Sequence, residues 1–355
     1  MVRWLLIAVL MLTACSAPAP GWSELPAPAA GARVLAMVPV DGGILVLGSV
    51  PGPDGRAPAA WTTADGRSWQ PVALAPHSAY AFQAELASAG VSGGQVTVLG
   101  QAFGGAHGSP RMTVWSGNST SLVEYPQPFE TFGGPRSIAV NAAAAGLLVG
   151  QWDGASGRYG AAVWTTADAR SWQLDADDPA LASAAGEQTS AVGVTSGPLG
   201  FLVAGGNQRG ADLLPLAWTS RDRQSWQRLT VPGTGSTAQR PACDTTGCVL
   251  FGASAGTRPQ ALCWPAGPGG PVGDARTGPT GSTVDITQAS LGAQAFVTLR
   301  VDSQAKLYSV TRDCATWTEL SLPVSAPEAH FASVPGGLLL ATTAPDASHL
   351  WLRTS

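Results

Sequence analysis

Charged residues are scarce in this chain of 355 residues, and lysine is nearly absent. Charged side chains make up 12% of the sequence, the formal net charge is −4, and Lys306 is the single lysine. A basic patch is the electrostatic feature of nucleic-acid-binding proteins, so the composition argues against a nucleic-acid partner. Hydrophobic residues make up 45% of the sequence, which a disordered polypeptide does not have. The length allows one large domain or two of medium size.

Long apolar runs are absent beyond the first residues. Arg3 precedes an apolar stretch over residues 4–12, which ends shortly before Cys15. The stretch is too short to span a bilayer as a mature helix, and no later stretch reaches the ~18 apolar residues that a transmembrane helix needs. This pattern is typical of an export signal that is removed from the mature protein.

The end of this stretch resembles the lipobox of bacterial lipoproteins, in which a cysteine after a small residue is lipidated and becomes the new N-terminus. A small residue, Ala14, precedes Cys15. The resemblance implies a signal peptide over residues 1–14, then a lipidated Cys15 and tether over residues 15–21. Such a protein is anchored in the cell membrane on its extracytoplasmic side. The alternative is an ordinary secretory signal that ends near Ala14 or Ala17, which also places the mature protein outside the cytoplasm.

Glycine and proline are abundant, and the rest of the chain is a repeat. The 44 Gly and 28 Pro residues fit short strands joined by turns and fit long helices poorly. In the repeated segment a tryptophan follows an aspartate by four positions. The clear copies are Asp65 and Trp69, Asp168 and Trp172, Asp222 and Trp226, and Asp313 and Trp317. Diverged copies around Trp115 and Trp264 give a period of about 50 residues, within the range of propeller blades.

Each period contains the same order of predicted strands. An alternating strand is followed by a Gly-rich turn, an apolar strand buried on both faces, the tryptophan strand, the aspartate turn and an outer strand. The apolar strand recurs at residues 44–47, 96–99, 147–149, 201–203, 249–251, 296–299 and 338–340. The sequence therefore predicts an all-β fold, a single seven-bladed β-propeller over residues 22–355 with four strands in each blade.

The last repeat lacks an outer strand of its own. Its three predicted strands cover residues 330–334, 338–341 and 349–352. Residues 21–26, at the other end of the mature chain, resemble the outer strands around Trp69 and Trp317. We predict that this N-terminal strand completes the last blade and closes the ring, which leaves no free sheet edge. An open pair of sandwiched sheets explains neither the sevenfold count nor the split repeat.

The aspartate–tryptophan segments resemble the Asp-box of BNR-repeat and sialidase-like propellers, Ser-x-Asp-x-Gly-x-Thr-Trp. Here four positions separate the two residues instead of five, so the glycine position is not clearly retained. A turn aspartate accepts hydrogen bonds from nearby backbone N–H groups, and the tryptophan ring packs against a neighbouring sheet. We expect these structural roles for the four aspartates and four tryptophans. Since each turn supplies a single carboxylate, we expect neither a metal nor a cofactor.

Five cysteines are present, of which Cys15 is the predicted lipid site. Cys243 and Cys248 flank a four-residue turn and can pair across a hairpin. Cys263 and Cys314 fall in neighbouring blades and can form a second disulfide, as an oxidising compartment favours. A thiol nucleophile is the alternative for these four residues, although no histidine adjoins them in sequence.

Several polar residues stand where the inner strands are predicted to begin, and they are candidates for ligand binding: Arg33, Arg136, Arg240, Gln188 and His330. Arg33 and Arg136 each precede the glycine before the second strand by ten residues, so we expect them at matching positions. Arginines from alternate blades would then border the mouth of the central channel and bind a carboxylate or a phosphate. The alternative is that each is a solvated loop arginine in an arginine-rich chain.

The sialidase resemblance implies three arginines on a substrate carboxylate, a tyrosine nucleophile paired with a glutamate, and an aspartate acid/base. The Arg-Ile-Pro signature of that family is absent, because Val34 follows Arg33, and no spacing pairs Tyr80 or Tyr159 with a glutamate. We therefore expect a non-catalytic, membrane-anchored propeller that binds a partner protein or an anionic glycan. A sialidase-like glycoside hydrolase and a scaffold for envelope complexes are the alternatives. The sequence leaves the ligand and the oligomeric state open, with a monomer as the working expectation.

Overall fold

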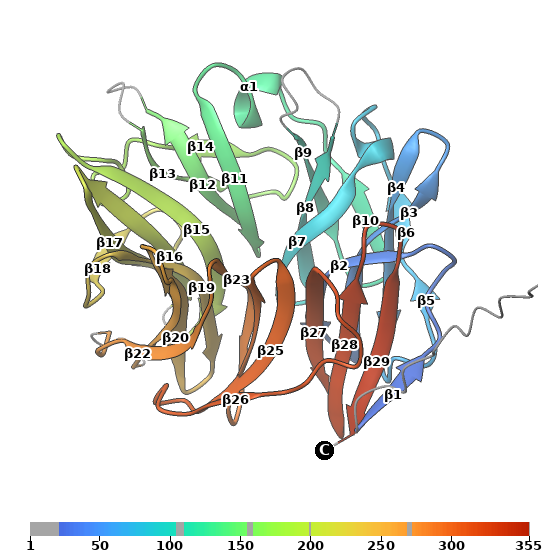
Figure 1. Ribbon diagram of the computed structural model, residues 1–355. Helices are drawn as coiled ribbons and strands as arrows, with labels where there is room; N and C mark the ends of the chain where they lie inside the picture. Colours follow the sequence, from blue (N-terminus) through green and yellow to red (C-terminus); the bar gives the residue numbers. More distant parts are fainter. Residues whose placement is uncertain (1–20, 104–109, 155–158, 199, 268–271, 355) are drawn as a thin grey trace, which may run out of the picture.

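Seven small antiparallel sheets stand in a ring around a central axis (Figure 1). The computed structural model describes residues 21–103, 110–154, 159–198, 200–267 and 272–354. The predicted signal peptide, Cys15 and the tether up to residue 20 lie outside the described residues. The prediction of a seven-bladed β-propeller with four-stranded blades is confirmed.

The first four blades follow the chain from inner to outer strand. Their strands are, for blade 1, β2 (Arg33–Val40), β3 (Gly43–Gly52), β4 (Gly55–Thr63) and β5 (Gln70–Pro71); for blade 2, β7 (Glu85–Ser92), β8 (Gln95–Ala102), β9 (Arg111–Gly117) and β10 (Ser121–Glu124); for blade 3, β11 (Ser137–Ala144), β12 (Leu147–Asp153), β13 (Tyr159–Thr165) and β14 (Gln173–Asp175); and for blade 4, β15 (Gln188–Gly197), β16 (Gly200–Arg209), β17 (Asp212–Ser220) and β18 (Gln227–Thr230). Blade 2 also gains a fifth strand, β6 (Ala73–Ala75), which pairs in parallel with β10.

The remaining blades repeat this order. Their strands are, for blade 5, β19 (Ser236–Asp244), β20 (Gly247–Ser254), β21 (Gln260–Ala266) and β22 (Arg276–Thr280); for blade 6, β23 (Val284–Leu291), β24 (Ala295–Val301), β25 (Gln304–Val310) and β26 (Trp317–Glu319); and for blade 7, β27 (Glu328–Val334), β28 (Gly337–Thr343), β29 (Ser348–Thr354) and β1 (Trp22–Leu25). Two short helices, η1 (Ala81–Gln83) and α1 (Phe129–Phe132), lie in connecting loops. Among the described residues, none of the helices has the length and apolar composition to cross a membrane.

The N-terminal strand closes the ring, as predicted. β1 pairs antiparallel with β29, which places Trp22 opposite Arg353 and Glu24 opposite Trp351. Both the start of β1 and the C-terminal end of β29 lie on the same face of the propeller, shown at the bottom of Figure 1. The turns between the third and fourth strands, which carry the aspartates, also lie on this face, because the third strand of each blade runs toward it as β29 does. We call it the Asp-turn face.

Apolar side chains fill the spaces between the blades. Seven buried clusters form the core, one at each interface between neighbouring blades. The second strands are buried on both faces, and the third strands of blades 2 to 5 each add a fully buried tryptophan: Trp115, Trp164, Trp218 and Trp264. Burial of two sheet faces per blade therefore stabilises the ring.

The inner strands of blades 1 to 6 each contain a β-bulge, whereas β27 of blade 7 pairs with β28 without a register shift. In blade 5 the shift falls between Ala238 and Arg240. A bulge adds one unpaired residue and re-aims the side chains beside it. The bulges therefore affect which residues of the inner strands of blades 1 to 6 point toward the channel.

Candidate functional site

A central channel with a volume of about 1100 Å³ runs between the inner strands. Much of its wall consists of small apolar residues, among them Ala36, Ala89, Ala142 and Ala289. Of the five residues predicted for ligand binding, Arg33, Arg240 and His330 line this channel, and Arg136 and Gln188 do not. The candidate site is therefore built differently from the predicted ring of arginines.

Arg33 stands at the mouth of the channel and is already paired. Its Nη1 donates to both carboxylate oxygens of Glu85 in the next blade, at 3.1 and 2.9 Å. The Ser49 hydroxyl donates to the same carboxylate at 2.7 Å, and Arg56 Nε donates to Ser49 Oγ at 3.0 Å. Because Glu85 neutralises the guanidinium, Arg33 has no free charge for a ligand.

Arg136 does not occupy the position that matches Arg33, so this prediction was wrong. Arg33 pairs with Ser49 of β3, which lies three positions beyond the residue that pairs with the tryptophan of β4. In blade 3 the inner-strand residue that pairs at the same distance from the tryptophan partner is Ala139. The β2–β3 hairpin has more residues between its turn and the partner of the tryptophan than the β11–β12 hairpin has. Counting ten residues back from the turn glycine therefore reaches a position in blade 3 that lies three residues before the true match. Arg136 lies exposed just before β11.

Of the two remaining candidates, Gln188 lies outside the channel and His330 lies in its wall. Gln188 is the exposed first residue of β15. His330 is in β27, where its Nε2 is buried without a hydrogen-bond partner and lies 4.0 Å from the Glu328 carboxylate. The nearby His330 ring lowers the pKa of Glu328, with Arg33 and Arg300 adding to this effect, and together they outweigh the burial that raises it. His330 and Glu328 thus form a polar pair on the channel wall.

Arg240 lies within the channel wall and bridges three blades. Its Nε donates to the carbonyl oxygen of Thr287 at 3.1 Å, and its Nη1 donates to those of Val192 and Gln239 at 3.2 and 3.1 Å. Burial lowers the pKa of the Arg240 guanidinium, while the charge of Asp285 raises it. No carboxylate among the described residues lies within ion-pair distance of Arg240.

A tyrosine–glutamate pair is present, but it belongs to a blade and not to the channel. The Tyr308 hydroxyl donates to Glu319 Oε2 at 3.1 Å, between β25 and β26. Burial raises the pKa of Tyr308, and the charge of Glu319 raises it further. A nucleophilic phenol needs the opposite shift, so this pair has a structural role.

The four turn aspartates bind their own turns. Oδ1 of Asp65 accepts hydrogen bonds from the backbone N–H groups two and three residues later, at 2.8 and 3.1 Å. Asp168 and Asp222 do the same, and Asp313 accepts the first of these bonds. Backbone hydrogen bonds hold the pKa of Asp168 and of Asp222 well below the usual range. Among the described residues, no group of three or more His, Cys, Asp or Glu side chains is arranged to hold a metal ion.

The residue after each turn aspartate has a left-handed backbone. The φ angle is +76° at Gly66 and between +61° and +66° at Ala169, Arg223 and Cys314. The companion tryptophans pack into clusters between two blades: Trp69 between blades 7 and 1, Trp172 between 2 and 3, Trp226 between 3 and 4, and Trp317 between 5 and 6. Each turn therefore fixes an outer strand against the preceding blade.

Both predicted disulfides are present. Cys243 pairs with Cys248 across the β19–β20 hairpin, and Cys263 of blade 5 pairs with Cys314 of blade 6. These four cysteines are therefore cross-links and not thiol nucleophiles.

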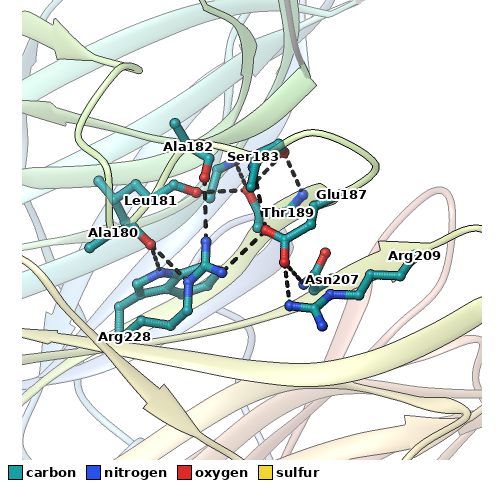
Figure 2. A network of polar contacts seen from close by, with 12 residues as sticks. Ala180, Leu181, Ala182, Ser183, Glu187, Thr189, Asn207, Arg209 and Arg228 are labelled. Atoms are coloured by element: carbon teal, nitrogen blue, oxygen red, sulfur yellow. Dashed lines mark hydrogen bonds and ion pairs between the residues drawn. The ribbon is translucent and has the colours of Figure 1, made fainter.

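A polar network holds the loop between blades 3 and 4, and no sequence motif predicts it (Figure 2). Glu187 accepts hydrogen bonds from Asn207 at 3.2 Å, from Arg228 at 3.3 Å and from Arg209. Burial raises the pKa of Glu187, but these donors and the backbone N–H of Ala184 outweigh it and lower the pKa to about 2. Arg228 also donates to the carbonyl oxygens of Ala180 and Ala182, so the network ties the loop to blade 4.

Exposed large apolar side chains form an arc on the face opposite the Asp-turn face. Over the described residues, every exposed large hydrophobic side chain lies in the loops and strand ends of blades 2 and 3 there: Tyr80, Phe82, Phe103, Phe129, Ile138 and Tyr159. We call these six residues the apolar arc; α1, which carries Phe129, lies at the top of Figure 1. Their exposed fractions run from 43% to 60%. The Arg111 guanidinium lies over the Phe129 ring, 5.2 Å from its centroid.

Comparisons with known proteins reveal the fold alone. No protein-family model matches the chain, and no curated protein matches its sequence. Among solved structures it is similar to YCF48 from Cyanidioschyzon merolae, with 13% identity and a TM-score of 0.52 over 94% of this chain and 99% of that one. It is also similar to a Trypanosoma rangeli sialidase in complex with 2,3-difluorosialic acid, with 12% identity and a TM-score of 0.50 over 95% of this chain and 59% of that one. Prolyl oligopeptidase B from Galerina marginata matches with 9% identity and a TM-score of 0.50 over 88% of this chain, which spans 47% of the peptidase.

Proposed function

We propose that this chain is a non-catalytic binding propeller that docks a partner protein on the apolar arc. The observation that carries the proposal is the clustering of all exposed large apolar side chains of the described residues on one sector of one face. Soluble proteins seldom keep such a patch exposed, because it costs free energy in water and promotes association. Aromatic side chains with an arginine beside them, as Phe129 has in Arg111, are the residue types that dominate binding energy at protein interfaces.

A protein partner fits this face better than an anionic glycan. The arginines expected to hold an anion at the mouth are not available together, since Glu85 neutralises Arg33 and Arg136 lies off the channel. For the same reason a sialidase-like hydrolase lacks support. A scaffold for envelope complexes is a special case of partner binding and agrees with the proposal.

The proposal includes a lipid anchor at Cys15 on the extracytoplasmic side of the cell membrane. It is supported by the lipobox-like residues before Cys15 and by the position of Trp22, which begins β1 on the Asp-turn face. A tether of six residues reaches at most roughly 20 Å. An anchored molecule therefore holds its Asp-turn face near the membrane and presents the apolar arc outward. Replacing Cys15 by Ala abolishes incorporation of radiolabelled palmitate if the anchor is correct, and unchanged labelling would overturn it.

The docking proposal is tested with a matched pair of surface variants of the full chain. One variant replaces three arc residues, Phe82→Ser, Phe129→Ser and Tyr159→Ser. The control replaces two exposed arginines of the Asp-turn face, Arg67→Ser and Arg221→Ser. We expect one partner to be captured by the unmodified protein and by the control, and its affinity for the arc variant to fall by roughly a hundredfold or more, as for loss of aromatic hot spots. If every captured protein binds all three forms equally, the arc is not the docking surface.

A further inference from the structure

We propose that Arg240 forms an anion-binding site within the central channel, suited to a small monocarboxylate with an apolar body. This site is separate from the apolar arc and goes beyond the docking function. The channel is large enough for a small molecule, and Arg240 is part of its wall.

The fold fixes the guanidinium before any ligand arrives. The bulge between Ala238 and Arg240 re-aims this part of β19, and three carbonyl oxygens then bind Nε and Nη1. These oxygens belong to Val192 in blade 4, Gln239 in blade 5 and Thr287 in blade 6. A donor held from three strands loses little conformational entropy when it binds a ligand, which favours affinity.

The remaining donors of Arg240 are free. Its Nη2 makes no hydrogen bond with the described residues and is not enclosed by them, so it is accessible to a ligand in the channel that Arg240 lines. Three carbonyl oxygens supply partial negative charge but no counter-ion. Asp285 acts on Arg240 only through space, because its own ion pair, at 3.1 Å, is with Arg300. An arginine remains charged even when buried, so an incoming anion would compensate a charge that the protein leaves unpaired.

The surroundings favour an apolar body and at most one further negative charge, because the Glu328 carboxylate already lies in the channel wall. The other two arginines of the channel wall, Arg33 and Arg300, are engaged by Glu85 and Asp285. A dianion such as phosphate would therefore keep one charge unpaired inside the channel, which is costly. The polar side chain of Gln288 is also committed, since both of its amide atoms bind the backbone of Phe331. The small alanine side chains of the wall are left to contact an alkyl group.

The test uses butyrate and its neutral analogue butyramide as probes, titrated into the full-length protein and followed by ligand-detected NMR. We expect butyrate to bind at least about tenfold more tightly than butyramide, the ratio that a charge-assisted hydrogen bond of ~1.4 kcal/mol supplies. Arg240→Gln should remove this preference. A tripeptide with a free C-terminal carboxylate and the same peptide as its amide form a second arm, which distinguishes a chain terminus from a free small carboxylate as the natural source.

Arg240 also links blades, so Arg240→Gln can reduce folding, and a second variant is needed. Arg240→Lys keeps a positive charge in the channel but loses the fork of N–H groups that bridges the blades. This variant should retain a preference for butyrate over butyramide, whereas Arg240→Gln loses it; a purely structural Arg240 predicts the same probe binding for both variants. Equal binding of both probes to the unmodified protein, or no preference for butyrate in an Arg240→Lys variant that is folded by circular dichroism, would overturn the proposal.

Discussion

The indole Nε1 of Trp22 donates a hydrogen bond to the carbonyl oxygen of Ser321, 299 residues away in sequence, at 2.8 Å. Trp22 is 6% exposed and packs between blades 6 and 7 with Leu307, Phe331 and Trp351. The closing strand is therefore held by side-chain packing as well as by its pairing with β29. β1 pairs with β29 over only four positions, so burial of the Trp22 side chain is the main contribution of this strand to the core.

Trp22→Ala should destabilise the propeller by about 3–5 kcal/mol, because it leaves a large cavity and an unpaired carbonyl group. Trp22→Phe should cost clearly less, since it retains most of the buried ring and loses the hydrogen bond. Denaturant unfolding followed by circular dichroism measures both values. A loss below about 1 kcal/mol for Trp22→Ala would contradict the role assigned to this residue.

The two disulfides should differ in their contribution to stability. Cys263–Cys314 closes 51 residues and Cys243–Cys248 closes 5. In the chain-entropy model the longer loop gives about 4 kcal/mol and the shorter about 2 kcal/mol. The double variants Cys263→Ala with Cys314→Ala, and Cys243→Ala with Cys248→Ala, should show this order in urea unfolding, and the reverse order would count against the model for this protein.

The repeat made the fold predictable. Seven apolar second strands and a last repeat without an outer strand are visible in the spacing alone, and the pairing of β1 with β29 follows from them. Covalent pairing of Cys263 with Cys314 was also predictable, because the two residues fall in neighbouring repeats.

The candidate site was much less predictable. The match of Arg136 to Arg33 failed because hairpin length differs between blades, and the spacing from a turn glycine does not record it. Arg33 and Glu85 lie in neighbouring blades and are 52 residues apart in sequence, so no local sequence pattern reveals that they pair. The bulge beside Arg240 recurs in blades 1 to 6, but the paired residue that follows it is not the same in every blade, and the loops that carry Phe82 and Tyr159 follow no period, so the site could not be derived by counting repeats.

Ala169→Gly should stabilise the protein. Ala169 follows a turn aspartate with φ +61°, a conformation that costs a residue with a Cβ atom roughly 1–2 kcal/mol and costs glycine little. Glycine loses more backbone entropy on folding, by about 0.4–1 kcal/mol, so a net gain of about 0.5 kcal/mol is expected. Gly66→Ala, at the equivalent position of blade 1, should reduce stability. Thermal unfolding of the two variants, with changes of opposite sign, checks this assignment of the turns.

Glu187 should make the free energy of unfolding depend on pH in the acidic range. Because its pKa is lowered from 4.5 to about 2 in the folded protein, its contribution is fully present above about pH 4.5 and is lost as the pH falls toward about 2. Glu187→Gln should cost about 2 kcal/mol near neutral pH, since it removes the charge that Arg209 and Arg228 face. Below the folded pKa the carboxyl group is neutral like the amide, so the difference between the two proteins should shrink. Glu130→Gln, at an exposed position, should show no such pH-dependent difference, and a gap between wild type and Glu187→Gln that stays constant from neutral pH to about pH 2 would contradict the role of the Glu187 charge.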